Sequence, residues 1–444
     1  MRTLISNVTI VNEGTSVKGS VVLNDNKIAE ICTEGKSPRR KCDETIDGTG
    51  MYLMPGVIDD HVHFREPGLT NKATIASESR AAAAGGVTSY MDMPNTKPTT
   101  VTIAALNEKF RRAAKDSRIN YSFYFGATNS NSDMFEKLTS RVCGIKLFMG
   151  SSTGNMLVDD TDGLDKVFSK ANMPIAVHCE DSDIINRNAA LYKEQYGDDP
   201  DVKFHPLIRS EEACYSSLVR AVELAKKHDK QLHVMHISTA RELGLLTTES
   251  LGNKKITAEA TPAHLTFCDS DYATLGTRIK CNPAIKSDND RAALREGINS
   301  GKIDIIGTDH APHLLGDKQG GALKATSGMP SIQFSLPSML QLVDDGVFTI
   351  EKVVEKMCHA PAELFKINKR GYIRKGYYAD LVLVAPDSPW TVSKENILSL
   401  CQWSPFEGRT FNWKVCRTWV NGQCVYNNGT VNDEVRGKAL KFTR

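Results

Sequence analysis

Eight short apolar runs alternate with longer amphipathic stretches between residues 56 and 309 of this 444-residue chain. The stretches ASESRAAAAGG, EEACYSSLVRAVELAKKH and DNDRAALREGINSG have the apolar spacing of helices. Eight strand–helix units over about 300 residues predict an α/β fold of the (β/α)8 barrel type, whose active sites lie at the carboxyl ends of the strands. An open doubly wound sheet is the alternative, but no GxGxxG loop opens a helix. The eight runs are GVIDDHVHF, GVTSYMDM, YSFYFGAT, GIKLFMG, MPIAVHC, QLHVMHI, KITAEATP and IDIIGTD.

Both ends of the chain have a different texture. TLISNVTIVNEG and SVVLNDNKIAEI alternate like strands, with a hairpin turn at Asn24-Asp25-Asn26. ADLVLVAPD and VCRTWVNGQCVY repeat this pattern near the other end, the second folded about Asn421-Gly422. We therefore expect residues 1–50 and 366–444 to form one composite small β domain, and residues 51–365 to form the barrel.

Composition narrows the class of partner. A formal charge of +2 gives no reason to expect nucleic acid or a membrane, so a small molecule is the expected ligand. No apolar stretch approaches the ~20 residues of a membrane span, and MRTLISNVTIVNEG lacks a signal-peptide core, which predicts a cytoplasmic protein. The eleven cysteines lack CxxC spacing, so we interpret them as reduced and mostly buried.

The first of the eight runs carries two histidines, His61 and His63. Side chains i and i+2 of a strand share a face, so both imidazoles can reach one metal ion. Other ionisable residues fall near the ends of later runs, and such residues are costly in apolar strands unless they are paired or bind a metal. All lie at the rim where a barrel has its active site. The six candidate metal ligands are His61, His63, Lys146, His178, His236 and Asp309.

Lys146 poses a chemical problem among these ligands. An ammonium group is repelled by divalent cations, and a metal ligand must offer a lone pair. We therefore expect the amine to have reacted with carbon dioxide. The resulting carbamate is an anion with two oxygens that can bridge two metal ions.

The remaining histidines divide by context. His313 follows Asp309 closely, in DHAPHLLGDK, where Pro312 stiffens the loop, and is a candidate for the site. His264 and His310 are ambiguous, whereas His205, His228, His233 and His359 are not expected to take part. The Gly-rich stretch GDKQGGALKATSG, residues 316–328, is the best candidate for a mobile loop, although an ordinary surface loop explains it equally well.

Four segments, DDHVHFREPG, DMPNTKPTT, KCNPAIK and GTDHAPHLLGDK, resemble those of the amidohydrolase superfamily, and within it the dihydroorotases. This resemblance implies that His61, His63, Lys146 and Asp309 hold the more buried of two metal ions. Carboxylated Lys146, His178 and His236 would then hold the second, with a hydroxide bridging the pair. Zinc suits this mixture of nitrogen and oxygen ligands.

The same resemblance implies an activity. Dihydroorotases reversibly hydrolyse the cyclic amide of dihydroorotate to N-carbamoyl-aspartate, a step of pyrimidine biosynthesis. Asp309 would move the proton to the departing ring nitrogen, and Arg65 would bind the substrate carboxylate with Asn95 beside it. Asn282 and His313 would complete the polar cradle. Asn95 and Asn282 could instead stabilise turns.

Three alternatives remain open. Allantoinase and hydantoinase are similar metal-dependent enzymes, but Arg65 favours a substrate with a carboxylate. A non-catalytic scaffold of the same fold is disfavoured, because all six ligands are present. We expect a homodimer, the commonest closed assembly. A physical association with aspartate transcarbamoylase is left open.

Overall fold

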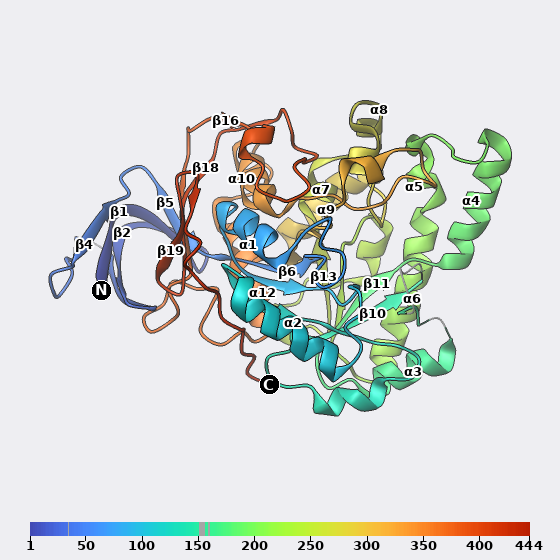
Figure 1. Ribbon diagram of the computed structural model, residues 1–444, viewed down its shortest axis with the longest axis horizontal. Coiled ribbons are helices and arrows are strands. Elements are labelled where there is room, and N and C mark those ends of the chain that lie inside the picture. Colours follow the sequence, from blue (N-terminus) through green and yellow to red (C-terminus); the bar gives the residue numbers. More distant parts are fainter. Residues whose placement is uncertain (34, 151–155, 159) are drawn as a thin grey trace.

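The barrel dominates a computed structural model that describes residues 1–33, 35–150, 156–158 and 160–444 (Figure 1). Neighbouring strands pair in parallel and follow one another in chain order. A bridge between Val62 and His310 joins the first strand to the segment after the last. The predicted (β/α)8 barrel is therefore confirmed. Its strands are β6 (Val57–Val62), β7 (Val87–Asp92), β8 (Asn120–Phe123) with β9 (Phe125–Gly126), β10 (Ile145–Met149), β11 (Ile175–Cys179), β12 (Leu232–Val234), β13 (Ile256–Ala260) and β14 (Ile305–Ile306).

Helices surround these strands, and their starts carry capping residues. Thr74 and Ser287 each form a capping box, and Ser210 accepts a hydrogen bond from the amide of Ala213. The longer helices are α1 (Ile75–Ala84), α2 (Ile103–Asp116), α3 (Thr161–Lys170), α4 (Ser182–Tyr196), α6 (Glu211–Lys227), α9 (Asp288–Ser300) and α10 (Ser335–Asp344). The shorter ones are α5 (His205–Ile208), α7 (Pro262–Thr266), α8 (Tyr272–Leu275), α11 (Ile350–Val354) and α12 (Ala360–Leu364), with a π-helical turn, Glu355–His359, between the last two.

The chain ends combine into one nine-stranded sheet beside the barrel (Figure 1). β5 pairs in parallel with β1 on one side and antiparallel with β15 on the other, which joins the two ends. Both predicted hairpins are present, between β2 and β3 and between β18 and β19. The domain boundaries at residues 50 and 366 remain predictions. The strands are β1 (Arg2–Asn12), β2 (Thr15–Asn24), β3 (Lys27–Thr33), β4 (Glu44–Asp47), β5 (Tyr52–Pro55), β15 (Leu381–Ala385), β18 (Lys414–Val420), β19 (Gln423–Asn427) and β20 (Thr430–Val431); β16 (Trp390–Thr391) pairs separately with β17 (Thr410–Phe411).

The last residues of the chain return to the barrel. Leu440 donates its amide to the carbonyl of Tyr121 near the start of β8. Its side chain and that of Phe442 are buried in a cluster with Tyr124, Ile305 and Phe365. The tail therefore packs at the amino-terminal end of the barrel, together with Phe365.

Two expectations drawn from composition can be compared with the structure. Nine of the eleven cysteines are buried, in agreement with their interpretation as small apolar side chains. Within the described ranges, no helix has the length and apolarity needed to cross a lipid bilayer.

Candidate active site

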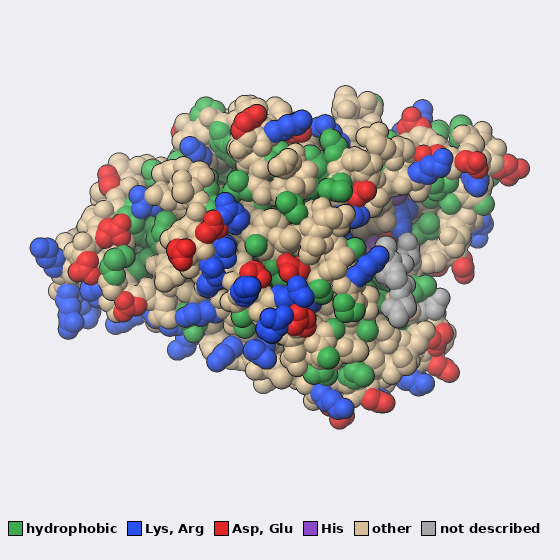
Figure 2. Space-filling view, viewed as in Figure 1, with side chains coloured by type: hydrophobic (Ala, Val, Ile, Leu, Met, Phe, Trp, Pro, Cys, Tyr) green, Lys and Arg blue, Asp and Glu red, His purple; other side chains and the backbone are tan. Residues whose placement is uncertain are grey.

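A cavity of about 510 Å³ opens at the carboxyl ends of the barrel strands. Figure 2 shows it as a hollow in which histidine and basic side chains are visible. All ten residues predicted for the site contribute to its wall, although they come from segments far apart in the sequence. These residues are His61, His63, Arg65, Asn95, Lys146, His178, His236, Asn282, Asp309 and His313.

Four histidines and Asp309 form a tight cluster on the floor of this cavity. Nε2 of His61 and Nε2 of His63 lie 3.2 and 3.0 Å from Oδ1 of Asp309. Nδ1 of His178 lies 3.0 Å from Nε2 of His236, and the rings of His61 and His236 are 5.2 Å apart. The structure therefore brings together the side chains that the sequence suggested as metal ligands.

The donor set of this cluster fits divalent metal ions. His61, His236 and Asp309 each offer a ligand atom within 4.8 Å of the others. Burial lowers the pKa of His61 and His236 well below the ordinary value, and although burial alone would raise that of Asp309, the neighbouring histidines lower it. Neutral imidazoles and an ionised carboxylate are the forms that bind metals.

Two of the histidines are also held in the orientation of a ligand. Nδ1 of His61 lies 3.0 Å from Oε1 of Glu259, and Nδ1 of His63 lies 2.8 Å from Oδ1 of Asn95. A proton on Nδ1 satisfies these acceptors and leaves Nε2 with its lone pair toward the cluster. Asn95 thus contacts the candidate metal ligand His63. The sequence predicted only that Asn95 lies beside the substrate.

Lys146 extends from β10 into the same cavity and is 1% exposed. Its Nζ lies 2.8 Å from the sulfur of Met235 and 5.0 Å from the centre of the Phe148 ring. Burial lowers the pKa of Lys146 to about 8. The amine is therefore easier to deprotonate than that of an exposed lysine.

The opposite side of the cavity presents a cation. Arg65 donates Nε to the carbonyl of Pro312 at 3.0 Å, and its Nη2 lies 2.9 Å from Nε2 of His313. Burial lowers the pKa of Arg65 to about 10, so the guanidinium stays charged at neutral pH. Among the described residues, no hydrogen bond engages Nη1 of Arg65 or the buried Oδ1 of Asn282. Both atoms can therefore meet a ligand.

Three residues of the cavity have backbone angles that favour glycine. The φ angles of Arg65, His236 and Asp309 are 66°, 40° and 46°. A non-glycine residue in this region costs on the order of 1–3 kcal/mol, and such strain is concentrated at functional sites. The surrounding fold holds these side chains where a regular strand would not.

Comparison with known proteins agrees with this geometry. A family model described as "Amidohydrolase family" matches residues 52–425. The chain belongs to the amidohydrolase family.

Relatives of this amidohydrolase carry several names. A dihydroorotase of Halobacterium salinarum is 34% identical over 430 residues, covering 93% of this chain and 96% of the relative. An allantoinase of Bacillus velezensis is 30% identical over 437 residues, covering 96% and 94%. Among solved structures, an L-hydantoinase from Arthrobacter aurescens superimposes with a TM-score of 0.91 at 28% identity, covering 97% of each chain.

His205 and Arg209 line the cavity of this amidohydrolase and Glu180 lies beside it, although the sequence identified none of the three. Nε2 of His205 donates to the carbonyl oxygen of Cys281 at 2.9 Å. Arg209 pairs at 2.7 Å with Glu180, which lies 3.0 Å from Nε2 of His178. Glu180 follows His178 at the same i+2 spacing that identified His61 and His63. The sequence therefore contained a signal that could have identified Glu180.

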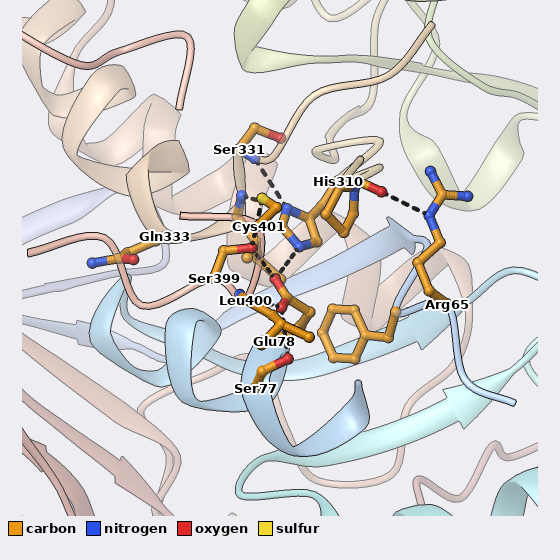
Figure 3. A network of polar contacts seen from close by, with 12 residues as sticks. Arg65, Ser77, Glu78, His310, Ser331, Gln333, Ser399, Leu400 and Cys401 are labelled. Carbon is orange, nitrogen blue, oxygen red and sulfur yellow. Dashed lines mark hydrogen bonds and ion pairs between the residues drawn. The ribbon is translucent and has the colours of Figure 1, made fainter. Parts of the chain in front are cut away.

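The two ambiguous histidines do not line the cavity. His264 lies 2.8 Å from the hydroxyl of Thr261, and His310 lies 2.8 Å from Glu78 (Figure 3). The Gly-rich stretch that is the candidate for a mobile loop forms part of the cavity wall from Ala322 to Gly328. The carboxylate of Asp199 accepts hydrogen bonds from three backbone amides of this loop, those of Gly321, Leu323 and Lys324.

Proposed function

We propose that this amidohydrolase is a dihydroorotase, which reversibly hydrolyses the cyclic amide of dihydroorotate to N-carbamoyl-aspartate. The observation that carries the proposal is the position of Arg65 in the same cavity as the cluster of histidines and Asp309. Dihydroorotate combines a cyclic amide with a carboxylate, and this cavity offers a site for each.

Two zinc ions complete this proposal. His61, His63, Lys146 and Asp309 would hold one, and Lys146, His178 and His236 would hold the other. Bound zinc polarises a carbonyl and lowers the pKa of water. Lys146 contributes as a carbamate: its neutral amine forms a bond to the carbon of carbon dioxide and releases a proton, and burial favours the neutral amine.

Asp309 moves the proton in the proposed reaction. Its carboxylate receives a proton from the attacking water and transfers it to the ring nitrogen as the carbon–nitrogen bond breaks. In ring closure the same carboxylate takes the proton from the carbamoyl nitrogen. The low pKa of Asp309 keeps it ionised between turnovers.

Arg65 and two asparagines orient the substrate. Nη1 of Arg65 binds the substrate carboxylate, and His313 fixes the guanidinium through Nη2. Oδ1 of Asn282 accepts a ring N–H, since a buried carbonyl without a partner is costly. Asn95 holds His63 and lies beside the substrate.

Allantoinase and hydantoinase are the alternative activities, and both names occur among the similar proteins. The hydantoin and allantoin rings carry no carboxylate, so a buried guanidinium facing them would lose its hydration without an anionic partner. A non-catalytic scaffold would not need the six converging side chains. A cytoplasmic location and a homodimer remain predictions.

The test compares turnover of dihydroorotate and N-carbamoyl-aspartate with that of allantoin and hydantoin, using zinc-loaded protein. We expect dihydroorotate to give the highest kcat/KM, and Arg65→Gln to lower it about 100-fold, since a charged hydrogen bond contributes ~1.5–3 kcal/mol. Arg111→Gln is the control, because Arg111 is exposed and pairs with Glu108 of its own helix. Faster hydrolysis of hydantoin or allantoin, or an unaffected Arg65→Gln variant, contradicts the proposal.

Metal analysis completes the test. About two zinc ions per chain and loss of activity on chelation support the enzyme. A metal-free preparation of unchanged stability favours the scaffold.

A further inference from the structure

The loop Asp309–His313 connects the two halves of the active site. Asp309 lies in the cluster of candidate metal ligands, and His313 contacts Arg65 on the substrate side. Arg65 also donates Nε to the carbonyl of Pro312. The position of this short loop therefore sets the distance between the metal side and the carboxylate side of the cavity.

One remote segment holds both ends of this loop. We call Ser399–Trp403 the bracing segment; it lies between β16 and β17, far in the sequence from any barrel strand. Figure 3 shows its residues Ser399, Leu400 and Cys401 beside Glu78 and His310. Its contacts with the loop run through Glu78 at one end and through Trp403 at the other.

Glu78 is the first connection. This residue of α1 is completely buried, and its Oε2 accepts hydrogen bonds from Nε2 of His310 at 2.8 Å and from the hydroxyl of Ser399 at 2.6 Å. Its Oε1 accepts from the amide of Leu400 at 3.1 Å. A buried carboxylate with such partners is held firmly, because losing one leaves a charge unsatisfied in the interior.

His310 transmits this anchor to the metal side. Its Nδ1 accepts from the amide of Ser331 at 3.0 Å, so the ring is held from both sides. Its backbone carbonyl accepts from the amide of His63 at 2.8 Å, and Asp309 precedes it with a φ of 46°. The ring of His310 therefore fixes the backbone that carries Asp309 and contacts His63.

Trp403 is the second connection. Its indole Nε1 donates to the carbonyl of His313 at 2.7 Å, and the side chain is fully buried. His313 in turn contacts Arg65 at 2.9 Å. Trp403 thus holds the end of the loop nearest the expected substrate carboxylate.

We propose that Glu78 and Trp403 are positioning residues of the active site: Glu78, which is held by the bracing segment, fixes the metal end of the loop Asp309–His313, and Trp403, which belongs to that segment, fixes the substrate end. The effect that this inference predicts on KM for dihydroorotate rests on the proposed function. Neither residue lines the cavity. Each acts through the loop, so the two connections can be broken separately.

The substrate end is tested with Trp403→Phe, which keeps an aromatic ring but removes the N–H donor. We expect KM for dihydroorotate to rise about five-fold, the equivalent of ~1 kcal/mol for one hydrogen bond, with kcat within about two-fold of the original. Zinc content should not change. Trp390→Phe is the matched control, because Trp390 donates Nε1 to the carbonyl of Trp413 and does not line the cavity.

The metal end is tested by the rate at which a chelator removes zinc. We expect Glu78→Ala to lose zinc at least about ten-fold faster than the original protein, because His310 would no longer anchor the backbone that carries the candidate ligand Asp309. Glu78→Gln keeps an oxygen that accepts from His310 and should restore part of the retention. Asp304→Ala is the control for general destabilisation, since Asp304 is also buried and accepts from the amide of Ala258 outside the site.

Hydrogen exchange of peptides covering residues 308–314 separates this inference from the proposed function. Faster exchange in Trp403→Phe and Glu78→Gln, but not in Trp390→Phe, supports the brace even if dihydroorotate is not the substrate. Unchanged exchange together with unchanged KM in Trp403→Phe overturns it. Equal zinc retention in Glu78→Ala and Asp304→Ala overturns the role of Glu78.

Discussion

Lys146 is the residue whose expected chemical state departs furthest from the ordinary one. It is buried beside four imidazoles, and an ammonium group there would oppose the binding of cations. Another lysine, Lys318, is equally buried, and burial lowers its pKa to about 7. Its Nζ, however, donates to the carbonyls of Lys280, Thr326 and Gly328, which satisfy an ammonium group. Burial alone does not distinguish the two lysines, but their partners do.

We therefore expect one carbamate per chain, on Lys146. Protein prepared with ¹³C-labelled bicarbonate should show a carbamate carbon signal by NMR that Lys146→Arg abolishes, together with most of the bound zinc. Lys318→Met should keep the signal. A signal that disappears in Lys318→Met and persists in Lys146→Arg contradicts the assignment.

Single residues of the site could be predicted because their positions follow from two simple rules. Paired spacing identified His61 and His63, and positions in or after apolar runs identified Lys146, His178, His236 and Asp309, all of which line one cavity; Lys146, however, is the second residue of β10 and does not lie at its end as predicted. The contact of Asn95 with His63 and the role of Glu78 depend on residues 32 and 232 positions away, respectively. No local pattern encodes such contacts.

The sequence predicted the order of the barrel strands correctly, but it overestimated the length of some of them. The eighth apolar run spans seven residues, IDIIGTD, but β14 covers only Ile305–Ile306. Beyond it the backbone is held by side chains, since Asp59 accepts from the amide of Thr308 at 3.0 Å and from its hydroxyl at 2.6 Å. β12 likewise ends at Val234, and His236 has a positive φ, so alternation along a strand does not describe where His236 points.

The π-helical turn between α11 and α12 contains a histidine that lies outside the site and forms hydrogen bonds through both ring nitrogens. Nδ1 of His359 donates to the carbonyl of Gly371 at 2.6 Å, and Nε2 accepts from the amide of Glu13 at 3.0 Å. Tyr372 stacks on the ring, and Glu13, Glu363 and Arg374 supply the nearby charges. This arrangement requires a neutral imidazole, because a proton on Nε2 would break the bond to Glu13.

Burial lowers the pKa of His359 below 6.5 in the folded state. A group with a lowered pKa stabilises the fold above the unfolded value, and this contribution is lost as pH falls toward the folded pKa. We expect Tm to fall between pH 7.5 and 5.5 by less in His359→Gln, which keeps one donor and one acceptor, than in the original protein. An equal or larger fall in Tm in the variant would refute this contribution of His359 to the pH dependence of stability.

At the scale of the whole molecule, the tail of the chain was the feature that the sequence did not reveal. The pairing of the two ends into one β domain followed from their shared strand pattern, and the structure shows it. The return of Leu440 and Phe442 to the barrel did not, since two apolar residues in a short polar stretch are too few to predict a buried segment. Their burial is set by the open end of a barrel whose strands lie hundreds of residues earlier.

Removing these tail contacts should destabilise the barrel. Leu440→Ala and Phe442→Ala each remove a nearly fully buried side chain, so we expect each to lower the free energy of unfolding by about 2–5 kcal/mol. Lys441→Ala is the control, because this side chain between them is exposed. Denaturation with urea measures the difference, and equal midpoints for all three variants would exclude a stabilising role for the tail.

The pairing of β5 with both β1 and β15 also has a consequence during synthesis. β1 to β5 leave the ribosome first, yet the edge of β5 is covered only when Leu381–Ala385 emerges. The barrel residues between them are translated in the meantime, at about 5–20 residues per second. For this interval of some tens of seconds the nascent chain exposes an unpaired strand edge, which can pair wrongly with another chain.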